Sequence, residues 1–144
     1  MPELLKDLIK TQIDPTIKSL GFVKRGSTYT KIENGFSKLI VVQSSQWNSF
    51  ETLSFTIECG IFFPDLYSRC FNELPQYPKI EHCLWQYRKR IGYLKGTVDT
   101  WYELKQGEDN QAILASAKND LTWYIRRYFD QYPTLYSFFA PSKT

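Results

Sequence analysis

The chain has 144 residues, of which 42% are hydrophobic and 23% are charged, and this ordinary globular composition excludes a disordered chain. Its formal net charge of +3 is far below the positive excess of proteins that live on phosphate backbones. The length fits one domain over residues 1–144, and no apolar run approaches the roughly 18 residues that cross a bilayer.

The first element predicted is an amphipathic N-terminal helix over residues 4–20, where apolar side chains recur at helical spacing. Pro15 interrupts this pattern because it has no N–H to bond toward residue 11. Two arrangements stay open: one helix that kinks at Pro15, or a short second helix that Asp14 caps. Gly21 offers a left-handed end to the helix, with Phe22 placed to pack back on the last turn.

The middle of the chain changes to the period of β-strands. Residues 27–33 and 36–43 flank Asn34-Gly35, a hairpin signal because both turn positions tolerate positive φ. Residues 53–61 then alternate apolar and polar side chains more clearly than any other segment. This alternation predicts a strand with one dry face and one polar face.

A less regular stretch follows. Three prolines mark it, and a short helical turn is expected around residues 67–74. We predict a fourth strand over residues 82–91, with Cys83, Trp85 and Tyr87 on one side, and a fifth strand over residues 97–104.

Helical spacing returns near the C-terminus. Either Asp109 or Asn110 is placed to cap a long helix that ends before Pro133. The tail over residues 132–139 is too aromatic for a solvated end and is expected to fold back. The helix has the following apolar stripe: Ile113, Leu114, Ala117, Leu121, Tyr124, Ile125 and Tyr128.

This order of elements predicts an α+β fold. Its antiparallel, meander-like sheet has about five strands, and the N-terminal helix and the long C-terminal helix pack on one face. The N-terminal residues 1–7 place charges too early for the apolar region of a signal peptide, which predicts a cytoplasmic protein. Three cysteines without close pairing agree with a reducing compartment.

Five segments of the sequence also stand in a characteristic order. They are 21–29 (GFVKRGSTY), 43–48 (QSSQWN), 59–62 (CGIF), 82–92 (HCLWQYRKRIG) and 101–104 (WYEL). In order and approximate spacing they resemble the domain of unknown function 4304 family of mostly bacterial proteins. The resemblance covers most of the chain and implies a compact α+β fold. It implies no activity and supplies no catalytic residue.

The most site-like segment is the loop over residues 43–49. It ends a strand with amides and hydroxyls around an indole, a combination that can hydrogen-bond a ligand and stack on it. The alternative is a polar turn whose side chains bond their own backbone. The candidate binding residues in this loop are Gln43, Ser45, Trp47 and Asn48.

The second candidate is a basic cluster. If residues 82–91 form a strand, Arg88 and Arg90 share a face and could grip an anion with two planar guanidinium groups. The alternative is that they pair with carboxylates across the sheet. We expect Trp47, Arg88 and Arg90, together with Gln43, to border one concave surface on the polar side of the sheet.

Catalytic and metal chemistry have little support in the sequence. His82 is the only histidine, and the adjacent Cys83 would point to the opposite face of a strand, where the two could not share a proton. Three cysteines and one histidine without a CxxC pair are a poor zinc set. We therefore expect no catalytic residue, no metal and no cofactor.

Three functional hypotheses remain. The favoured one is a protein-binding or regulatory module, of which an immunity protein is one example, because aromatic residues make up 17% of the chain and rings favour interfaces. The second is a weak nucleic-acid binder that uses lysine, arginine and tryptophan side chains. The third is an enzyme acting on a small anionic substrate. A protein is the expected partner, and a membrane is not.

Overall fold

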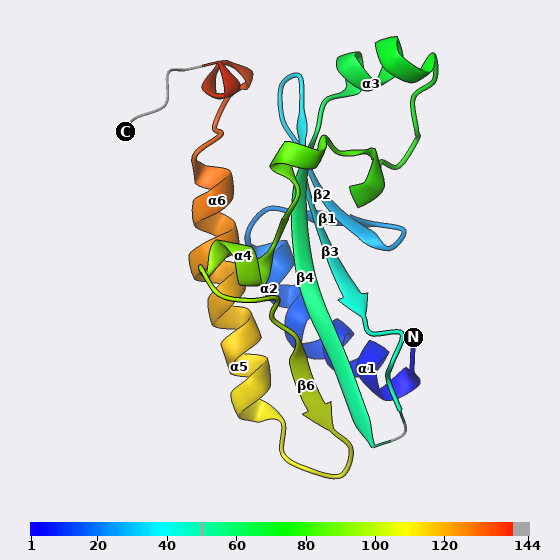
Figure 1. The fold of residues 1–144 in the computed structure, drawn as a ribbon, viewed down its shortest axis with the longest axis vertical. Coiled ribbons are helices and arrows are strands. Elements are labelled where there is room, and N and C mark those ends of the chain that lie inside the picture. Colours follow the sequence, from blue (N-terminus) through cyan, green and yellow to red (C-terminus); the bar gives the residue numbers. More distant parts are fainter. Residues whose placement is uncertain (50, 140–144) are drawn as a thin grey trace.

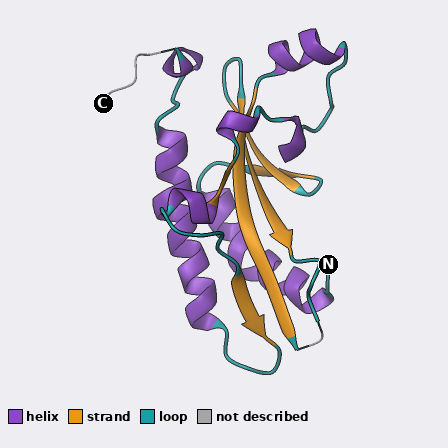
Figure 2. Ribbon diagram, in the orientation of Figure 1, coloured by secondary structure: helices purple, strands orange, loops and turns teal. Residues whose placement is uncertain are grey.

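The computed structural model describes residues 1–49 and 51–139, which form one antiparallel sheet with helices against it (Figures 1 and 2). The α+β prediction is confirmed. The elements are, in chain order, α1 (Glu3–Leu8), η1 (Ile9–Ile13), α2 (Asp14–Ser19), β1 (Val23–Arg25), β2 (Thr28–Ile32), β3 (Ser37–Ser44), β4 (Thr52–Phe62), α3 (Pro64–Phe71), η2 (Ile80–His82), η3 (Trp85–Tyr87), β5 (Lys89–Arg90), α4 (Ile91–Leu94), β6 (Tyr102–Lys105), α5 (Gln111–Asp120), η4 (Leu121–Ile125), α6 (Arg126–Asp130) and η5 (Leu135–Phe138).

The N-terminal helix is continuous from α1 through η1 to α2. Of the two arrangements left open at Pro15, the capped second helix is wrong, since Asp14 itself has helical dihedral angles and no capping bond. A π-helical turn, η1, precedes the proline, a common way for a helix to absorb an interruption. Gly21 ends the helix at φ 96°, and Phe22 packs on Phe129 with ring centroids 5.5 Å apart.

The sheet runs in the order β1-β2-β3-β4-β5, and β6 also pairs with β4. The hairpin predicted at Asn34-Gly35 is confirmed, because β2 and β3 pair antiparallel across this turn, where Gly35 takes a positive φ of 92°. Strand β1 had escaped the sequence analysis, although Gly26-Ser27 between β1 and β2 is itself a two-residue hairpin signal.

The expected fourth strand over residues 82–91 is wrong. Two 3₁₀ turns, η2 and η3, occupy most of it, and β5 is only two residues long, paired with Glu58 and Cys59. The fifth strand begins later than expected, at Tyr102, and pairs with β4 rather than with β5. The long strand β4 therefore has β3 along one edge and both β5 and β6 along the other.

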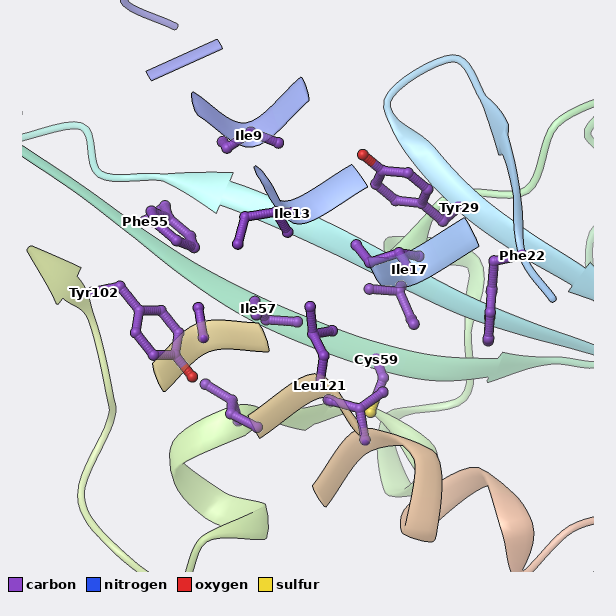
Figure 3. Close-up of a cluster of buried hydrophobic side chains, with 14 of the residues drawn as sticks. Ile9, Ile13, Ile17, Phe22, Tyr29, Phe55, Ile57, Cys59, Tyr102 and Leu121 are labelled. Carbon is purple, nitrogen blue, oxygen red and sulfur yellow. The ribbon is translucent and has the colours of Figure 1, made fainter. Parts of the chain in front are cut away.

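The main core lies between the sheet and the two long helices (Figure 3). The predicted dry face of β4 is confirmed, because Leu53, Phe55, Ile57, Cys59 and Ile61 are all buried. Ile13 and Ile17 of the N-terminal helix and Leu121 of the C-terminal helix meet these residues (Figure 3). On the other face of the sheet, a smaller apolar cluster contains Leu39, Phe62, Ile80 and Cys83.

The C-terminal helix runs without a break from Gln111 to Asp130, alongside β4 (Figure 1). Asn110 is the residue before the helix, but its side chain bonds Lys105, while the Asp109 carboxylate accepts the Gln111 N–H at 3.0 Å. The predicted apolar stripe is largely buried, with Ile113 as the exposed exception.

The aromatic tail folds back, as predicted. Phe138 stacks on Tyr132 with ring centroids 4.4 Å apart, and it meets Phe36 and Phe63 edge-on at 5.0 Å and 4.8 Å. These contacts close one end of the main core.

Each long helix is tied to the sheet by a buried aspartate. Tyr29 of β2 donates its hydroxyl to Asp14 at 2.9 Å, and Tyr102 of β6 donates to Asp120 at 2.6 Å. A lysine completes each pair, Lys18 for Asp14 and Lys95 for Asp120. Burial raises the pKa of the Asp14 carboxyl, but its bonds from Lys18 and Tyr29 outweigh this and hold the pKa below its ordinary value.

Candidate functional site

A hollow that contains most of the predicted binding residues lies beside the loop after β3, on the sheet face that the long helices leave open. Its volume is about 440 Å³. Gln43 and Trp101 neighbour residues that face the core, Val42 and Tyr102, and so point to the opposite face of the sheet. The lining residues are Gln43, Ser44, Ser45, Gln46, Trp47, Arg90 and Trp101.

Gln43, near the end of β3, supplies a wall of the hollow. Its Nε2 donates to Glu58 Oε1 at 3.1 Å. Its Oε1 is buried and receives no hydrogen bond from residues 1–49 and 51–139. An unpaired buried acceptor costs about 1–3 kcal/mol, so this oxygen marks a place where a donor would be stabilising.

The loop after β3 is fixed by its own polar side chains. Ser45 Oγ accepts the Trp47 N–H at 3.0 Å. The Asn48 side chain bonds both backbone groups of Ser54, accepting its N–H at 2.7 Å and donating to its carbonyl at 3.2 Å. Ser45 and Asn48 therefore shape the loop, and Asn48 does not line the hollow. Trp47 is left projecting into solvent.

Arg90 reaches the other side of the hollow from β5. Its Nη1 bonds Asp99 Oδ2 at 2.7 Å, and Trp101 Nε1 donates to the same oxygen at 3.2 Å. The guanidinium carbon lies 5.8 Å from the centroid of the Trp101 ring, within the range of a cation–π contact. Asp99 thus holds the arginine and the indole together at the rim.

Residues 97–101, which carry Asp99 and Trp101, follow a path that depends on a close approach to Gly92. A Cβ at Gly92 would lie 2.4 Å from the Val98 carbonyl oxygen and 2.8 Å from the Thr100 nitrogen. Thr56 Oγ1 of β4 donates to the Thr100 carbonyl at 2.6 Å and fixes the segment from the sheet side.

Arg88 does not line the hollow, but it binds Glu58, which in turn bonds the lining residue Gln43. Its Nε bonds Glu58 Oε2 at 2.9 Å, and its Nη2 bonds Oε1 at 3.4 Å. Because Glu58 Oε1 also accepts from Gln43, this carboxylate links the arginine to the wall. Arg88 lies outside β5, which begins at Lys89, so the two arginines do not form the predicted pair on one strand, and the alternative of pairing with a carboxylate across the sheet is confirmed for Arg88.

Comparison with known proteins places this fold in a family. The model of the family described as Domain of unknown function (DUF4304) matches residues 13–131. The chain belongs to this family. No curated protein and no solved structure matches it.

All seven residues that line the hollow lie within the matched DUF4304 region. Four of them are among the binding residues predicted from the sequence, namely Gln43, Ser45, Trp47 and Arg90, and their role in binding stays a prediction. It had missed Asp99 and Trp101. The available signal was alternation: Tyr102 belongs to the dry face of its strand, so Trp101 belongs to the face of Arg90.

Elsewhere in the DUF4304 domain, His82 and Cys83 are engaged separately. His82 Nδ1 accepts the Lys79 N–H at 2.9 Å. Burial raises the pKa of the Cys83 thiol to about 12, so at neutral pH it stays protonated and is a poor nucleophile.

No cluster of three metal-ligating side chains occurs within residues 1–49 and 51–139, and the absence of metals and cofactors stays a prediction. Within the same residues, every helix is too short or too polar to cross a membrane.

Proposed function

We propose that this DUF4304 domain is a protein-binding module with a regulatory role, and that its contact surface is the open sheet face around the Trp47–Trp101 hollow. The strongly exposed indole of Trp47, which lines the hollow together with Trp101 and Arg90, carries this proposal. Indole side chains are highly buried in the average protein, since their large apolar area is costly to hydrate. Here the exposed fractions are as follows: Trp47 84%, Trp85 81%, Trp123 55% and Trp101 38%.

The hollow combines the residue types that dominate protein interfaces. Tryptophan and arginine are the side chains most enriched among residues that carry binding energy. Trp47 and Trp101 flank Arg90, which Asp99 already holds in place, so little side-chain freedom is lost when a partner binds.

The two other hypotheses have weaker support. A nucleic-acid surface needs uncompensated cations, whereas Arg88 and Arg90 each face a carboxylate within 3 Å. An acid–base enzyme needs a group that titrates near neutral pH, and the lining of the hollow consists of amide, hydroxyl, indole and guanidinium side chains. These contacts favour recognition over chemistry.

The test is a quantitative pull-down with the tagged full chain from its native cell, followed by calorimetry with the purified protein that co-elutes. Trp47→Ala combined with Trp101→Ala is expected to weaken binding about thirtyfold or more, the effect of losing a hot spot worth about 2 kcal/mol. Thermal melting of the variant checks that the fold persists.

The matched control is Trp123→Ala. Trp123 is also an exposed indole beside an arginine, with Arg127 4.5 Å from its ring, but it belongs to the C-terminal helix. The control is expected to bind like the unmodified chain. Equal binding by the double variant would overturn the assignment of this face.

A further inference from the structure

A second hollow, separate from the first, lies between the N-terminal helix and the turn of the β1–β2 hairpin, which Figure 1 shows on the same side of the molecule. Its volume is about 440 Å³, within the roughly 300–1,000 Å³ of small-molecule sites. Lys6 and Lys10 reach it from the helix and Lys24 from β1, and none of its lining residues within the described part of the chain, 1–49 and 51–139, is acidic.

The three lysines have little compensation from carboxylates. Lys6 has only a long contact, 3.9 Å, to the exposed Glu3. Within residues 1–49 and 51–139, no carboxylate lies within 4.0 Å of the Lys10 or Lys24 ammonium. Like charges four residues apart on a helix repel each other, so Lys6 and Lys10 destabilise the free helix slightly. An anion between them would remove that cost.

The nearest buried carboxylate does not neutralise the hollow. Asp14 is already bound by the Tyr29 hydroxyl and by Lys18, both at 2.9 Å, and the Lys24 charge only helps to lower the pKa of its carboxyl. Lys24 instead lies over the Tyr29 ring, 5.8 Å from its centroid. The ammonium groups at the mouth of the hollow are therefore free to meet a ligand.

The remaining lining is suited to a ligand that is not only charged. Ile9 and Tyr29 are buried core residues that form an apolar floor together with Val42. At the hairpin turn, Gly26 has φ 65° and open space where a side chain would stand, and Ser27 adds an exposed hydroxyl. The positive charges at the mouth and the apolar floor below them fit a ligand with an anionic group at one end and an apolar group at the other.

We propose that this hollow binds an organic phosphate, with the phosphate among Lys6, Lys10 and Lys24 and an apolar or aromatic body on the floor. Lysine ammonium groups bind phosphate as compact point charges. This site is independent of the proposed protein-binding face and shares no residue with its hollow. Lys6 and Lys10 precede the matched family region, so the inference concerns this chain and not DUF4304 domains in general.

The probes are ADP, pyrophosphate and adenosine, each titrated into the full chain by calorimetry at low salt. ADP is expected to bind saturably, pyrophosphate more weakly, and adenosine not measurably at 1 mM or so, an affinity limit near 4 kcal/mol. A second arm uses vesicles with and without phosphatidic acid, because a lipid headgroup offers the same chemistry as a soluble phosphate. Saturable binding in either arm supports the site if substitution of Lys10 and Lys24 weakens that binding.

The variant is Lys10→Gln combined with Lys24→Gln, with Lys105→Gln on β6 as an exposed-lysine control. The double variant is expected to weaken binding at least about tenfold, the effect of losing one charge-assisted contact. The control is expected to have no effect, and thermal melting verifies folding. Absence of saturable binding in both arms overturns the proposal. So does equal weakening by the control, or adenosine binding as tight as that of ADP.

Discussion

The two faces of β4 are buried by different means. On the helix side, Phe55, Ile57 and Ile61 pack into one continuous apolar core. On the other side, Thr56 and Glu58 are equally buried but each relies on specific partners, the Thr100 carbonyl for one and Arg88 with Gln43 for the other. The helix side is thus held by apolar area, whereas the other face combines these directional bonds with the smaller apolar cluster around Phe62.

The difference explains how a hollow can exist on this sheet without weakening the core. The helix side already supplies the large, non-directional stabilisation of apolar burial. The open side then needs only enough polar contacts to satisfy its buried groups. Side chains at the end of β3, such as Trp47, can therefore stay exposed without loss of stability. We expect stability to depend mainly on the first face and recognition on the second.

The largest expected effect is the loss of stability when a side chain on the helix-facing side of β4 is truncated. Ile57→Ala should lower the free energy of unfolding by about 2–5 kcal/mol, because a buried aliphatic is replaced by a cavity. Ile32→Ala, at an exposed position on β2, should change it by about 1 kcal/mol at most. Urea denaturation measures both, and equal losses would contradict the stated position of the core.

The next effect compares two arginines of the polar side. Glu58 and Arg88 have side chains 6% and 25% exposed, whereas Arg90 and Asp99 are 44% and 45% exposed. Arg88→Ala removes the charged hydrogen-bond partner of a buried carboxylate and should cost about 2–3 kcal/mol of unfolding free energy. Arg90→Ala should cost about 1 kcal/mol or less. A larger loss for Arg90 would show that the rim of the hollow supports the fold.

A smaller effect appears at alkaline pH. Burial, together with the bond to Asp120, raises the pKa of Tyr102 above its ordinary value, and the same causes act on Tyr29 with Asp14. Above pH 10 or so the unfolded tyrosine loses a proton that the folded one keeps. The free energy of unfolding should therefore fall as pH rises, by at most about 1.4 kcal/mol per pH unit for each such tyrosine.

Tyr102→Phe isolates the share of one residue in this decline. Urea denaturation between about pH 9 and 11 should show a shallower decline in the variant than in the unmodified chain. Parallel curves would mean that the folded and unfolded states titrate Tyr102 alike, against the geometry of its bond to Asp120.

The sequence predicts the structure of a segment well where all of its buried side chains face the same core, and poorly where they pack against different parts of the molecule. The alternation of residues 53–61 and the helical stripes each face a single core, so their periods identify them. Residues 82–91 alternate in the same way, but Cys83 packs over Gly60 of β4, while Tyr87 packs on Phe138 of the tail. A Cβ at Gly60 would lie 3.0 Å from the Cys83 sulfur, so this packing requires a glycine in the partner strand.

The candidate site could be predicted only in part, namely where the order of the strands brings its residues together. Gln43, Trp47 and Arg90 come together because consecutive antiparallel strands place their ends side by side. Asp99 and Trp101 arrive on a segment whose path depends on a close backbone approach at Gly92. No period in the sequence encodes that approach, so the position of Asp99 beside Arg90 became visible only in the folded chain.

The central claim, that the open face recognises a partner while the helix side maintains the fold, has one direct test. The chain has four tryptophans, and each gives one indole N–H signal in a nitrogen–proton NMR spectrum. Adding the purified partner from the pull-down should shift or broaden the signals of Trp47 and Trp101 and leave that of Trp123 in place. A shifted Trp123 signal with unchanged Trp47 and Trp101 signals would contradict the account.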